Sequence, residues 1–159
     1  MTTIRTSAAS ANLGATLRPA REDDLAAIER LLTASDLPLA GVAEILPTVV
    51  VAESDGAVVG MAGLEVRGDS ALLRSVAVTP EWRSRGLGRA LVTRVIADAE
   101  ARGIRALYLL TTTAEHYFPS FGFRKITRDE APDAIRTTVE FQEACPASAT
   151  AMCCVLGLR

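Results

Sequence analysis

The alternation of apolar and polar positions along this chain predicts seven strands separated by helices. Runs rich in apolar and β-branched residues predict strands over residues 17–19, 48–53, 57–66, 71–78, 104–110, 123–127 and 149–156. Apolar positions at helical spacing predict one helix that begins at residues 21–24. They predict four more helices over residues 42–46, 86–102, 114–121 and 129–144. The order β-α-α-β-β-β-α-β-α-β-α-β predicts an α/β fold of the mixed (α+β) kind. We expect a central mixed, mostly antiparallel sheet with helices on both faces.

The turns and the absence of linkers predict the domain organisation. Asp55-Gly56 is a strong hairpin signal and Gly68-Asp69 predicts a second turn, so residues 48–78 form an antiparallel meander. No linker or internal repeat divides the chain, which predicts one domain over residues 16–159. Residues 1–15 are mostly Ala, Ser and Thr with no acid, a composition that predicts a disordered tail.

Composition narrows the classes of function. The 159 residues suit one domain, and 49% hydrophobic residues exclude global disorder. A net charge of −2 argues against nucleic-acid binding by broad phosphate neutralisation. No apolar run reaches the roughly 20 residues of a membrane helix. Three cysteines, an odd number, predict no disulfide framework. We therefore expect a cytoplasmic protein that does not bind membranes.

The turn after the fourth predicted strand predicts an anion site. The first turn of a helix has N–H groups without intrahelical partners and carries partial positive charge. Gly86 and Gly88 lack side chains, so a phosphate can approach the backbone closely. Arg83, Arg85 and Arg89 add full charges. The alternative is a solvated basic helix start, but the flanking strand and helix both favour the anion site.

The spacing of the glycines restricts which nucleotide-binding motif this turn can form. A P-loop would need Gly, four residues, and Gly-Lys-Ser/Thr, and the chain has no such run. The dinucleotide fingerprint needs a third glycine where Leu91 stands. The remaining pattern is Arg-x-x-Gly-x-Gly, formed by Arg83, Gly86 and Gly88.

This pattern resembles the pyrophosphate loop of the GCN5-related N-acetyltransferases (GNAT), which bind acetyl-coenzyme A. Residues 75–80 resemble the family's splayed central strand, and residues 117–123 resemble its late helix ending in Gly-Phe. The resemblance extends over about residues 17–154 and implies the GNAT fold. It implies that acetyl-CoA contacts the following residues: Val76, Ala77, Val78, Arg83, Ser84, Arg85, Gly86, Leu87, Gly88, Arg89, Ala90 and Phe118.

Narrower likenesses concern the acceptor. Residues 72–76, 108–115 and 145–149 resemble the N-acetyltransferases of bacterial arsenic-resistance operons. The Leu-Thr-Thr segment at 110–112, followed by an aromatic-rich helix, is also similar to N-acetylglutamate synthases. These likenesses imply a small, amino-acid-like amine with an acidic group.

This chain departs from the family pattern at the position of the general acid. Many family members use a tyrosine four residues before the glycine of the Gly-Phe pair, but counting back from Gly122 gives Phe118. Tyr117 is one residue earlier, roughly 100° around an α-helix. Tyr117 is therefore either the acid that protonates the departing thiolate or a core-capping residue with its hydroxyl at the surface.

Arg74 is the main candidate for binding the acceptor. Strand alternation places it on the same face as Val76, and a buried arginine needs a partner. That partner is either a carboxylate or oxyanion of the acceptor or a structural ion pair with Glu65 or Asp69, and both interpretations stay open.

The remaining candidates have weaker signals. Glu65 ends a strand and is the candidate base, acting through water, with surface solvation as the alternative. Ser75, Thr111, Thr112 and His116 are candidate acceptor-binding residues. Strand-end threonines and a solvated histidine are the alternatives for the last three.

The cysteines are expected to be structural. Adjacent residues of a strand point to opposite faces, so Cys153 and Cys154 do not form a pair. We interpret them, with Cys145, as small buried hydrophobes.

Two classes of function follow. The first is an acetyl-CoA-dependent N-acetyltransferase that acts in a ternary complex on an arsenic-containing amino acid or related toxic amine, or alternatively on glutamate or another amino acid. The second is a non-catalytic acyl-CoA sensor, which Phe118 favours because it carries no proton to donate. The late apolar strand also suggests a homodimer. We expect no metal.

Overall fold

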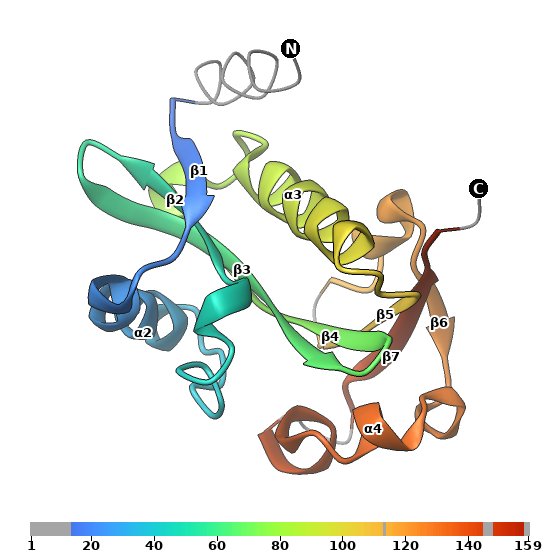
Figure 1. Ribbon diagram of the computed structural model, residues 1–159. Helices are drawn as coiled ribbons and strands as arrows, with labels where there is room; N and C mark the ends of the chain where they lie inside the picture. Colours follow the sequence, from blue (N-terminus) through green and yellow to red (C-terminus); the bar gives the residue numbers. More distant parts are fainter. Residues whose placement is uncertain (1–13, 113, 145–147, 158–159) are drawn as a thin grey trace. The chain divides into compact units, whose positions relative to one another are not determined.

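A computed structural model describes residues 14–112, 114–144 and 148–157. Its strands are β1 (Thr16–Pro19), β2 (Val50–Ser54), β3 (Ala57–Arg67), β4 (Ser70–Val78), β5 (Ala106–Thr111), β6 (Arg124–Ile126) and β7 (Thr150–Val155). Its α-helices are α2 (Leu25–Ala34), α3 (Leu87–Ala101) and α4 (Asp133–Arg136). The strands form one mixed sheet in the order β1-β2-β3-β4-β5-β7-β6 (Figure 1). The predicted fold class and the number of strands are confirmed.

The chain divides into two compact units. The first comprises Met1–Gly63 and Ser75–Val95, and the second comprises Leu64–Arg74 and Ile96–Arg159. Strands β3 and β4 and helix α3 each contribute residues to both units, so the single domain over residues 16–159 stays a prediction. Most of the predicted tail over residues 1–15 lies outside the described residues, but Ala15 is described and is buried.

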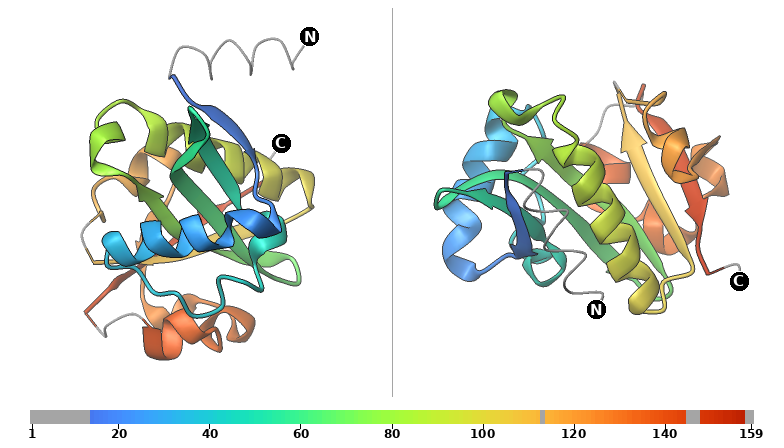
Figure 2. Two further views of the ribbon diagram at one scale, coloured as in Figure 1. Left: turned by 90° about the vertical axis from the view of Figure 1, so that its left-hand side faces the viewer. Right: turned by 90° about the horizontal axis from the view of Figure 1, so that it is seen from above.

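In the first unit, an antiparallel sheet carries helices on both faces. Helix α2 lies across β2 and β3 (Figure 2) and buries Ile28, Leu31 and Leu32 in one core cluster with Met61. Gly60 of β3 lies against helix α3, on the other face of the sheet. A Cβ added at Gly60 would lie 3.0 Å from a methyl carbon of Leu91 on α3. Strand β3 therefore uses a glycine to let α3 approach closely.

The hairpin between β2 and β3 forms as the sequence predicts. Asp55 and Gly56 have φ angles of 51° and 80°. Positive φ at both central residues is what a two-residue type I′ turn requires, and it explains the Asp-Gly pair.

A buried ion pair fixes the entry to α2. Arg18 donates to both carboxylate oxygens of Asp24, at 2.8 and 3.0 Å, and to Glu53 at 2.7 Å. Asp24 also accepts the Arg21 N–H at 2.7 Å. The hydrogen bond from Arg18 is the main reason that the pKa of Asp24 is lowered from 3.8 to about 2.

Asp24→Asn is expected to reduce the free energy of unfolding at pH 7 by about 2 kcal/mol. A carboxyl with a lowered native pKa stabilises the fold above its unfolded pKa, and this contribution is lost as the pH falls from about 5 towards 2. Urea unfolding between pH 7 and pH 3 measures both effects. Asp23→Asn is the control, because the Asp23 side chain is 82% exposed. Equal stability of the two variants at pH 7 would contradict the prediction.

The second unit is built around β5 and β7. β5 pairs antiparallel with β7 along its full length, and β7 pairs antiparallel with β6. Residues 128–144 cover one face of these strands through a buried cluster whose members are Leu72, Ala131, Ile135, Phe141 and Ala151. Among the described residues of the whole chain, no helix is both long and apolar enough to span a bilayer.

Three predicted helices are wrong or only partly correct. Of the predicted helix at 42–46, residues 42–45 form turns, and a 3₁₀ turn follows at Leu46–Thr48. The predicted helix at 114–121 is a turn followed by a 3₁₀ helix at Phe118–Phe121. The predicted helix at 129–144 breaks into a 3₁₀ turn at Arg128–Glu130, the four-residue α4, and a π-helical turn at Glu140–Ala144. Pro47, Pro119 and Pro132 lack the N–H that a longer α-helix needs, so these segments stay short.

Candidate functional site

The predicted anion turn lies between β4 and α3 and belongs to the first unit. Ser84 and Gly86 have positive φ angles of 68° and 84°, which bend the chain sharply before the helix. The Ala90 N–H donates to the Gly86 carbonyl at 3.1 Å, so Gly86 precedes the first helical residue, Leu87. The N–H groups of Leu87 and Gly88 therefore have no acceptor within the helix. This backbone can bind an anion.

Two of the basic side chains hold the turn itself. The Arg83 Nε donates to the Val78 carbonyl at 3.1 Å, which ties the turn to the end of β4. The Arg85 guanidinium lies over the Trp82 ring, 4.7 Å from its centroid. Arg83, Arg85 and Arg89 are all exposed. The turn thus has a defined shape and a positively charged surface.

Some of the residues predicted to contact the cofactor have buried side chains. Leu87 is 1% exposed and Ala77 is 5% exposed, with Ala77 part of the α2 core cluster. Val76 and Val78 are half-buried. Main-chain contacts of these residues with a cofactor stay a prediction.

A change of backbone at Ser75 separates the two halves of β4. Within the second unit, Ser70–Leu72 pair in parallel with Ala106–Tyr108, and this register does not extend to Leu73 and Arg74. Ser75 follows with a φ of 62°, an uncommon value for a residue other than glycine. The splay of this strand that the family resemblance implies stays a prediction.

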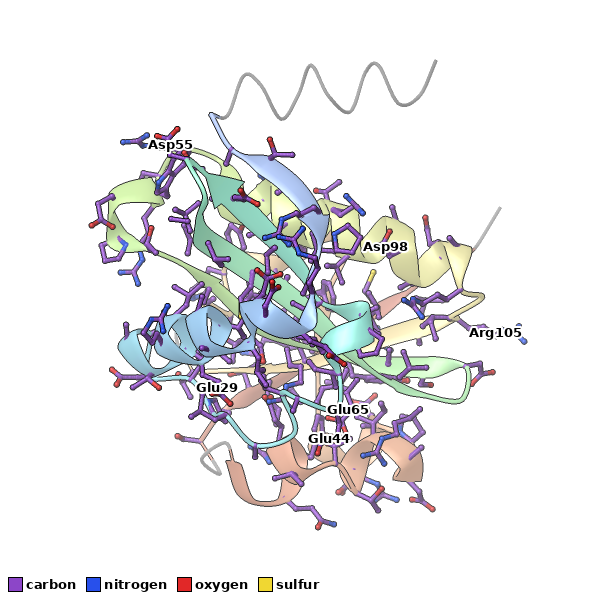
Figure 3. The ribbon with its side chains drawn as sticks, turned by 60° about the vertical axis from the view of Figure 1, so that its left-hand side comes forward. Glu29, Glu44, Asp55, Glu65, Asp98 and Arg105 are labelled. Atoms are coloured by element: carbon purple, nitrogen blue, oxygen red, sulfur yellow. The ribbon has the colours of Figure 1, made fainter. Side chains whose placement is uncertain are left out.

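Arg74 lies in a buried cluster of charges in the second unit. Its side chain is 1% exposed, and its Nε lies 3.2 Å from an oxygen of Glu140. Its Nη1 lies 3.5 Å from Glu65, whose other oxygen accepts from Arg67 at 2.5 Å. Figure 3 marks Glu65 on β3. The structural ion pair with Glu65 therefore forms, and acceptor binding by Arg74 stays a prediction.

Sequence reasoning missed Glu140. This residue is 5% exposed and lies in a segment predicted to be an ordinary helix. The sequence offered only two general signals for this residue. A buried arginine needs an acidic partner, and Glu140 stands between the apolar residues Val139 and Phe141. Because Glu65 is shared by two arginines, its role as a base through water also stays a prediction.

Tyr117 and Phe118 occupy an aromatic cluster. The Tyr117 ring is edge-on to Phe118 and Phe121, with both centroids 5.2 Å away, and Tyr117 is 37% exposed. Phe118 is buried and packs edge-on against Phe123. Tyr117 immediately precedes a 3₁₀ helix, so the estimate of 100° per residue is wrong for this segment; 3₁₀ geometry turns about 120° per residue.

The other candidate acceptor-binding residues lie in different environments. The Thr111 hydroxyl accepts the Ala114 N–H at 2.9 Å and so shapes the turn after β5. Thr112 and His116 are exposed, and Ser75 is buried. Their contacts with an acceptor stay predictions.

The two described cysteines are buried, as expected. Cys153 lies opposite Tyr108 in the β5–β7 register, and burial raises the pKa of its thiol. The Cys154 Sγ lies 3.7 Å from the Phe121 carbonyl. Cys145 lies outside the described residues. The part of the chain that the structure describes contains no group of three or more His, Cys, Asp or Glu suited to a metal.

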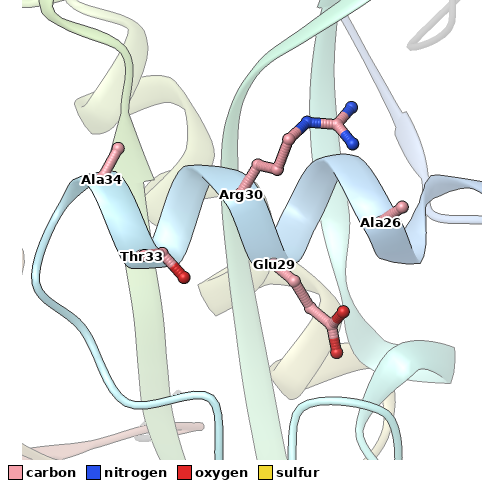
Figure 4. A pocket seen from close by; sticks show the side chains of 5 residues that line it. All are labelled: Ala26, Glu29, Arg30, Thr33 and Ala34. Carbon is pink, nitrogen blue, oxygen red and sulfur yellow. The ribbon is translucent and has the colours of Figure 1, made fainter.

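A shallow hollow on the outer side of α2 contains none of the predicted residues. Ala26, Glu29, Arg30, Thr33 and Ala34 line it, and all five come from one helix (Figure 4).

Comparison with known proteins gives matches to acetyltransferases. The family model described as Acetyltransferase (GNAT) domain matches residues 46–125, half of the chain. An amino-acid acetyltransferase of Pseudomonas syringae pv. tomato is 36% identical over 94 residues, which cover 58% of this chain and 22% of the relative. One from Aeromonas salmonicida is 35% identical over 82 residues, covering 50% and 19%. The chain thus spans about one fifth of the length of these relatives.

Solved structures agree with the fold. N-acetylglutamate synthase from Neisseria gonorrhoeae, complexed with coenzyme A and N-acetyl-glutamate, superposes with a TM-score of 0.78 and 23% identity, over 90% of this chain and 35% of that one. Rv2747 from Mycobacterium tuberculosis, in complex with CoA, gives 0.76 and 25%, over 89% and 99%.

Proposed function

Because the chain belongs to the GNAT acetyltransferase family, we propose that it transfers the acetyl group of acetyl-CoA to the amine of a small, amino-acid-like acceptor with an acidic group. The turn between β4 and α3 carries this proposal. Its first N–H groups, which have no acceptor within the helix, its glycines and its exposed arginines suit the diphosphate of coenzyme A. The amino-acid acetyltransferases among the relatives support the class of acceptor. An arsenic-containing or other toxic amino acid stays a prediction from the sequence alone.

The chemistry assigns a task to three groups. The acceptor nitrogen attacks the thioester carbonyl and loses a proton, and we propose that water held by Glu65 takes it. The C–S bond then breaks, and the departing thiolate receives a proton from the Tyr117 hydroxyl. Backbone N–H groups at the start of α3 position the diphosphate and hence the thioester. The step is direct, with no acetyl group carried by the protein.

The non-catalytic sensor is the second candidate. Phe118 occupies the position of the usual acid, and the Tyr117 ring lies in an aromatic cluster. An assay of free thiol release from acetyl-CoA, across acidic, neutral and basic amino acids, separates the two functions. Turnover with any acceptor supports the transferase. Tight acetyl-CoA binding without turnover supports the sensor, and absence of binding overturns both.

Tyr117→Phe tests the proposed acid. Loss of the hydroxyl is expected to lower kcat by about 10²-fold with KM almost unchanged, because general acid catalysis contributes about that factor. Tyr108→Phe is the matched control, since Tyr108 is the only other tyrosine and its hydroxyl faces Cys153. Equal kcat values for the two variants would remove Tyr117 from the mechanism. Steady-state kinetics with a saturating acceptor give the comparison.

A further inference from the structure

Trp82 belongs to the turn between β4 and α3, and both its backbone and its ring are held in place. Its N–H donates to the Thr79 carbonyl at 2.9 Å, which closes the 3₁₀ turn at Pro80–Trp82. Gly14 lies against the far end of the indole ring, because a Cβ added at Gly14 would be 3.2 Å from the Trp82 Cη2 atom. The φ of Gly14 is 80°, so glycine suits this position by its conformation as well as by its size. The fold itself therefore sets the position of the Trp82 ring.

The Arg85 side chain is oriented by that ring. Its guanidinium lies over the Trp82 ring, 4.7 Å from the centroid. Ser84, with a φ of 68°, bends the chain sharply between the two residues. A cation over an indole face at this distance is attracted by the negative face of the ring. An arginine loses much rotamer freedom when it binds a ligand, so an arginine that is already held loses less.

The charge of Arg85 is available to a ligand. Arg85 is exposed, and within the part of the chain that the structure describes no carboxylate pairs with it. Stacking uses the face of the guanidinium and leaves its N–H groups, at the edge, able to donate to phosphate oxygens. Arg85 stands two residues before Leu87, where α3 begins. It thus suits a phosphate group of a ligand that is bound at the start of this helix.

We propose that Trp82 is a positioning residue that holds Arg85 for a phosphate group of coenzyme A. The inference rests on the function proposed above and adds the residue that prepares this arginine for the cofactor. Trp82 contributes no charge of its own and acts through Arg85. The phosphate belongs either to the diphosphate or to the 3′-phosphate of the ribose, since both offer the same oxygens to a guanidinium.

Tryptophan fluorescence tests the stack of Arg85 on Trp82 without any ligand, because Trp82 is the only tryptophan of the chain. In Arg85→Gln the guanidinium no longer covers the ring, so acrylamide is expected to quench the emission more strongly than in the unmodified chain. Arg30→Gln, which removes an exposed positive charge from α2 in the same unit, is the control and should leave the quenching unchanged. Equal quenching of Arg85→Gln and the unmodified chain would overturn the proposal.

Calorimetric titration with coenzyme A tests whether Trp82 acts through Arg85. Arg85→Gln is expected to weaken binding by about 10-fold, the contribution of one charge-assisted hydrogen bond. Trp82→Leu is expected to weaken it by about threefold, because the stack is lost while the charge remains. When Arg85 is already glutamine, Trp82→Leu should change the affinity by less than about twofold. An equal loss in both backgrounds, or no loss in either single variant, overturns the proposal.

The salt dependence of binding separates positioning from a general loss of structure. Salt screens exposed charges, so the affinity of Arg85→Gln is expected to depend less on the NaCl concentration. Trp82→Leu should reduce this dependence as well, although Trp82 is uncharged. Trp82→Phe keeps an aromatic face and is expected to bind within about twofold of the unmodified chain. An unaltered salt dependence in Trp82→Leu, or an equal loss of affinity in Trp82→Phe, contradicts positioning. Because Arg85 is exposed, Arg85→Gln keeps the proposal falsifiable even if Trp82→Leu does not fold.

Dephospho-CoA, which lacks the 3′-phosphate, identifies the phosphate that Arg85 binds. A loss in Arg85→Gln that persists with dephospho-CoA assigns Arg85 to the diphosphate, and a loss that disappears assigns it to the 3′-phosphate. Both results support the proposal. The proposed function fails separately, if the unmodified chain binds coenzyme A but releases no thiol from acetyl-CoA with any acceptor. Absence of coenzyme A binding by the unmodified chain overturns both.

Discussion

Gly88→Glu is expected to weaken acetyl-CoA binding by about 10³-fold without lowering the thermal stability of the unliganded chain. The new carboxylate would stand in the first turn of α3, where the diphosphate is proposed to bind. Two unit charges about 5 Å apart repel by roughly 3 kcal/mol at an effective dielectric constant of about 20, and a diphosphate carries more than one charge. A factor of about 10³ corresponds to roughly 4 kcal/mol.

The thermal stability of the unliganded Gly88→Glu variant is not expected to fall with its affinity for acetyl-CoA. Gly88 lies inside α3 and, unlike Gly86, is not among the residues with positive φ. Glutamate is a better helix former than glycine by up to about 1 kcal/mol, and an acid near a helix N-terminus adds a few tenths more. The melting temperature of the unliganded chain is therefore expected to stay equal or rise.

Calorimetric titration with acetyl-CoA, together with thermal melts, measures both quantities. Thr93→Glu is the matched control, because Thr93 is exposed on the same helix and lies beyond its first turn. It is expected to change the affinity by less than threefold. Wild-type affinity in Gly88→Glu would show that the start of α3 does not hold the cofactor.

Arg74→Ala is expected to reduce the free energy of unfolding by about 3–5 kcal/mol. The loss comes less from the attraction itself than from the charges left behind. Glu140 and Glu65 have side chains only 7% and 15% exposed, and both would lose the guanidinium that lies between them. Glu65 keeps its contact with Arg67, but a buried carboxylate that loses an ion pair is strongly destabilised.

A compensated variant tests this explanation. Changing Arg74 to methionine and both glutamates to glutamine removes the three buried charges and leaves Arg67, whose side chain is 37% exposed, so most of the lost stability should return. Arg105→Ala is the control, because Arg105 is exposed and its side chain extends away from the ribbon (Figure 3). Urea unfolding at pH 7 gives the free energies. A loss below 1 kcal/mol in Arg74→Ala would mean that the glutamates find solvent or other partners.

Local sequence patterns predicted the parts of the fold that depend on neighbouring residues. The Asp55-Gly56 turn and the helices α2 and α3 all follow from the conformational preferences of nearby positions. The anion turn belongs to this group as well, because a strand, two glycines and a helix start are contiguous in the chain.

Segments with mixed signals were predicted less well. Residues 114–121 and 129–144 have helical apolar spacing, but they also contain prolines and are held by contacts with distant residues. Arg128, for example, donates to the carbonyls of Phe141 and Ala149, which are far from it in sequence. Such contacts select turns and a π-helical segment where spacing alone predicts a regular helix.

The sequence by itself determined the seven strands, the GNAT resemblance and the turn that can receive a diphosphate, since each depends on residues close together in the chain. Only the tertiary structure decided which acids surround Arg74. Glu140 stands 66 positions after Arg74, and alternation along a strand says nothing about what folds over it. Because both side chains are buried, the pair of Arg74 and Glu140 is important for stability. A charge that is removed from water requires a partner, wherever in the sequence that partner lies.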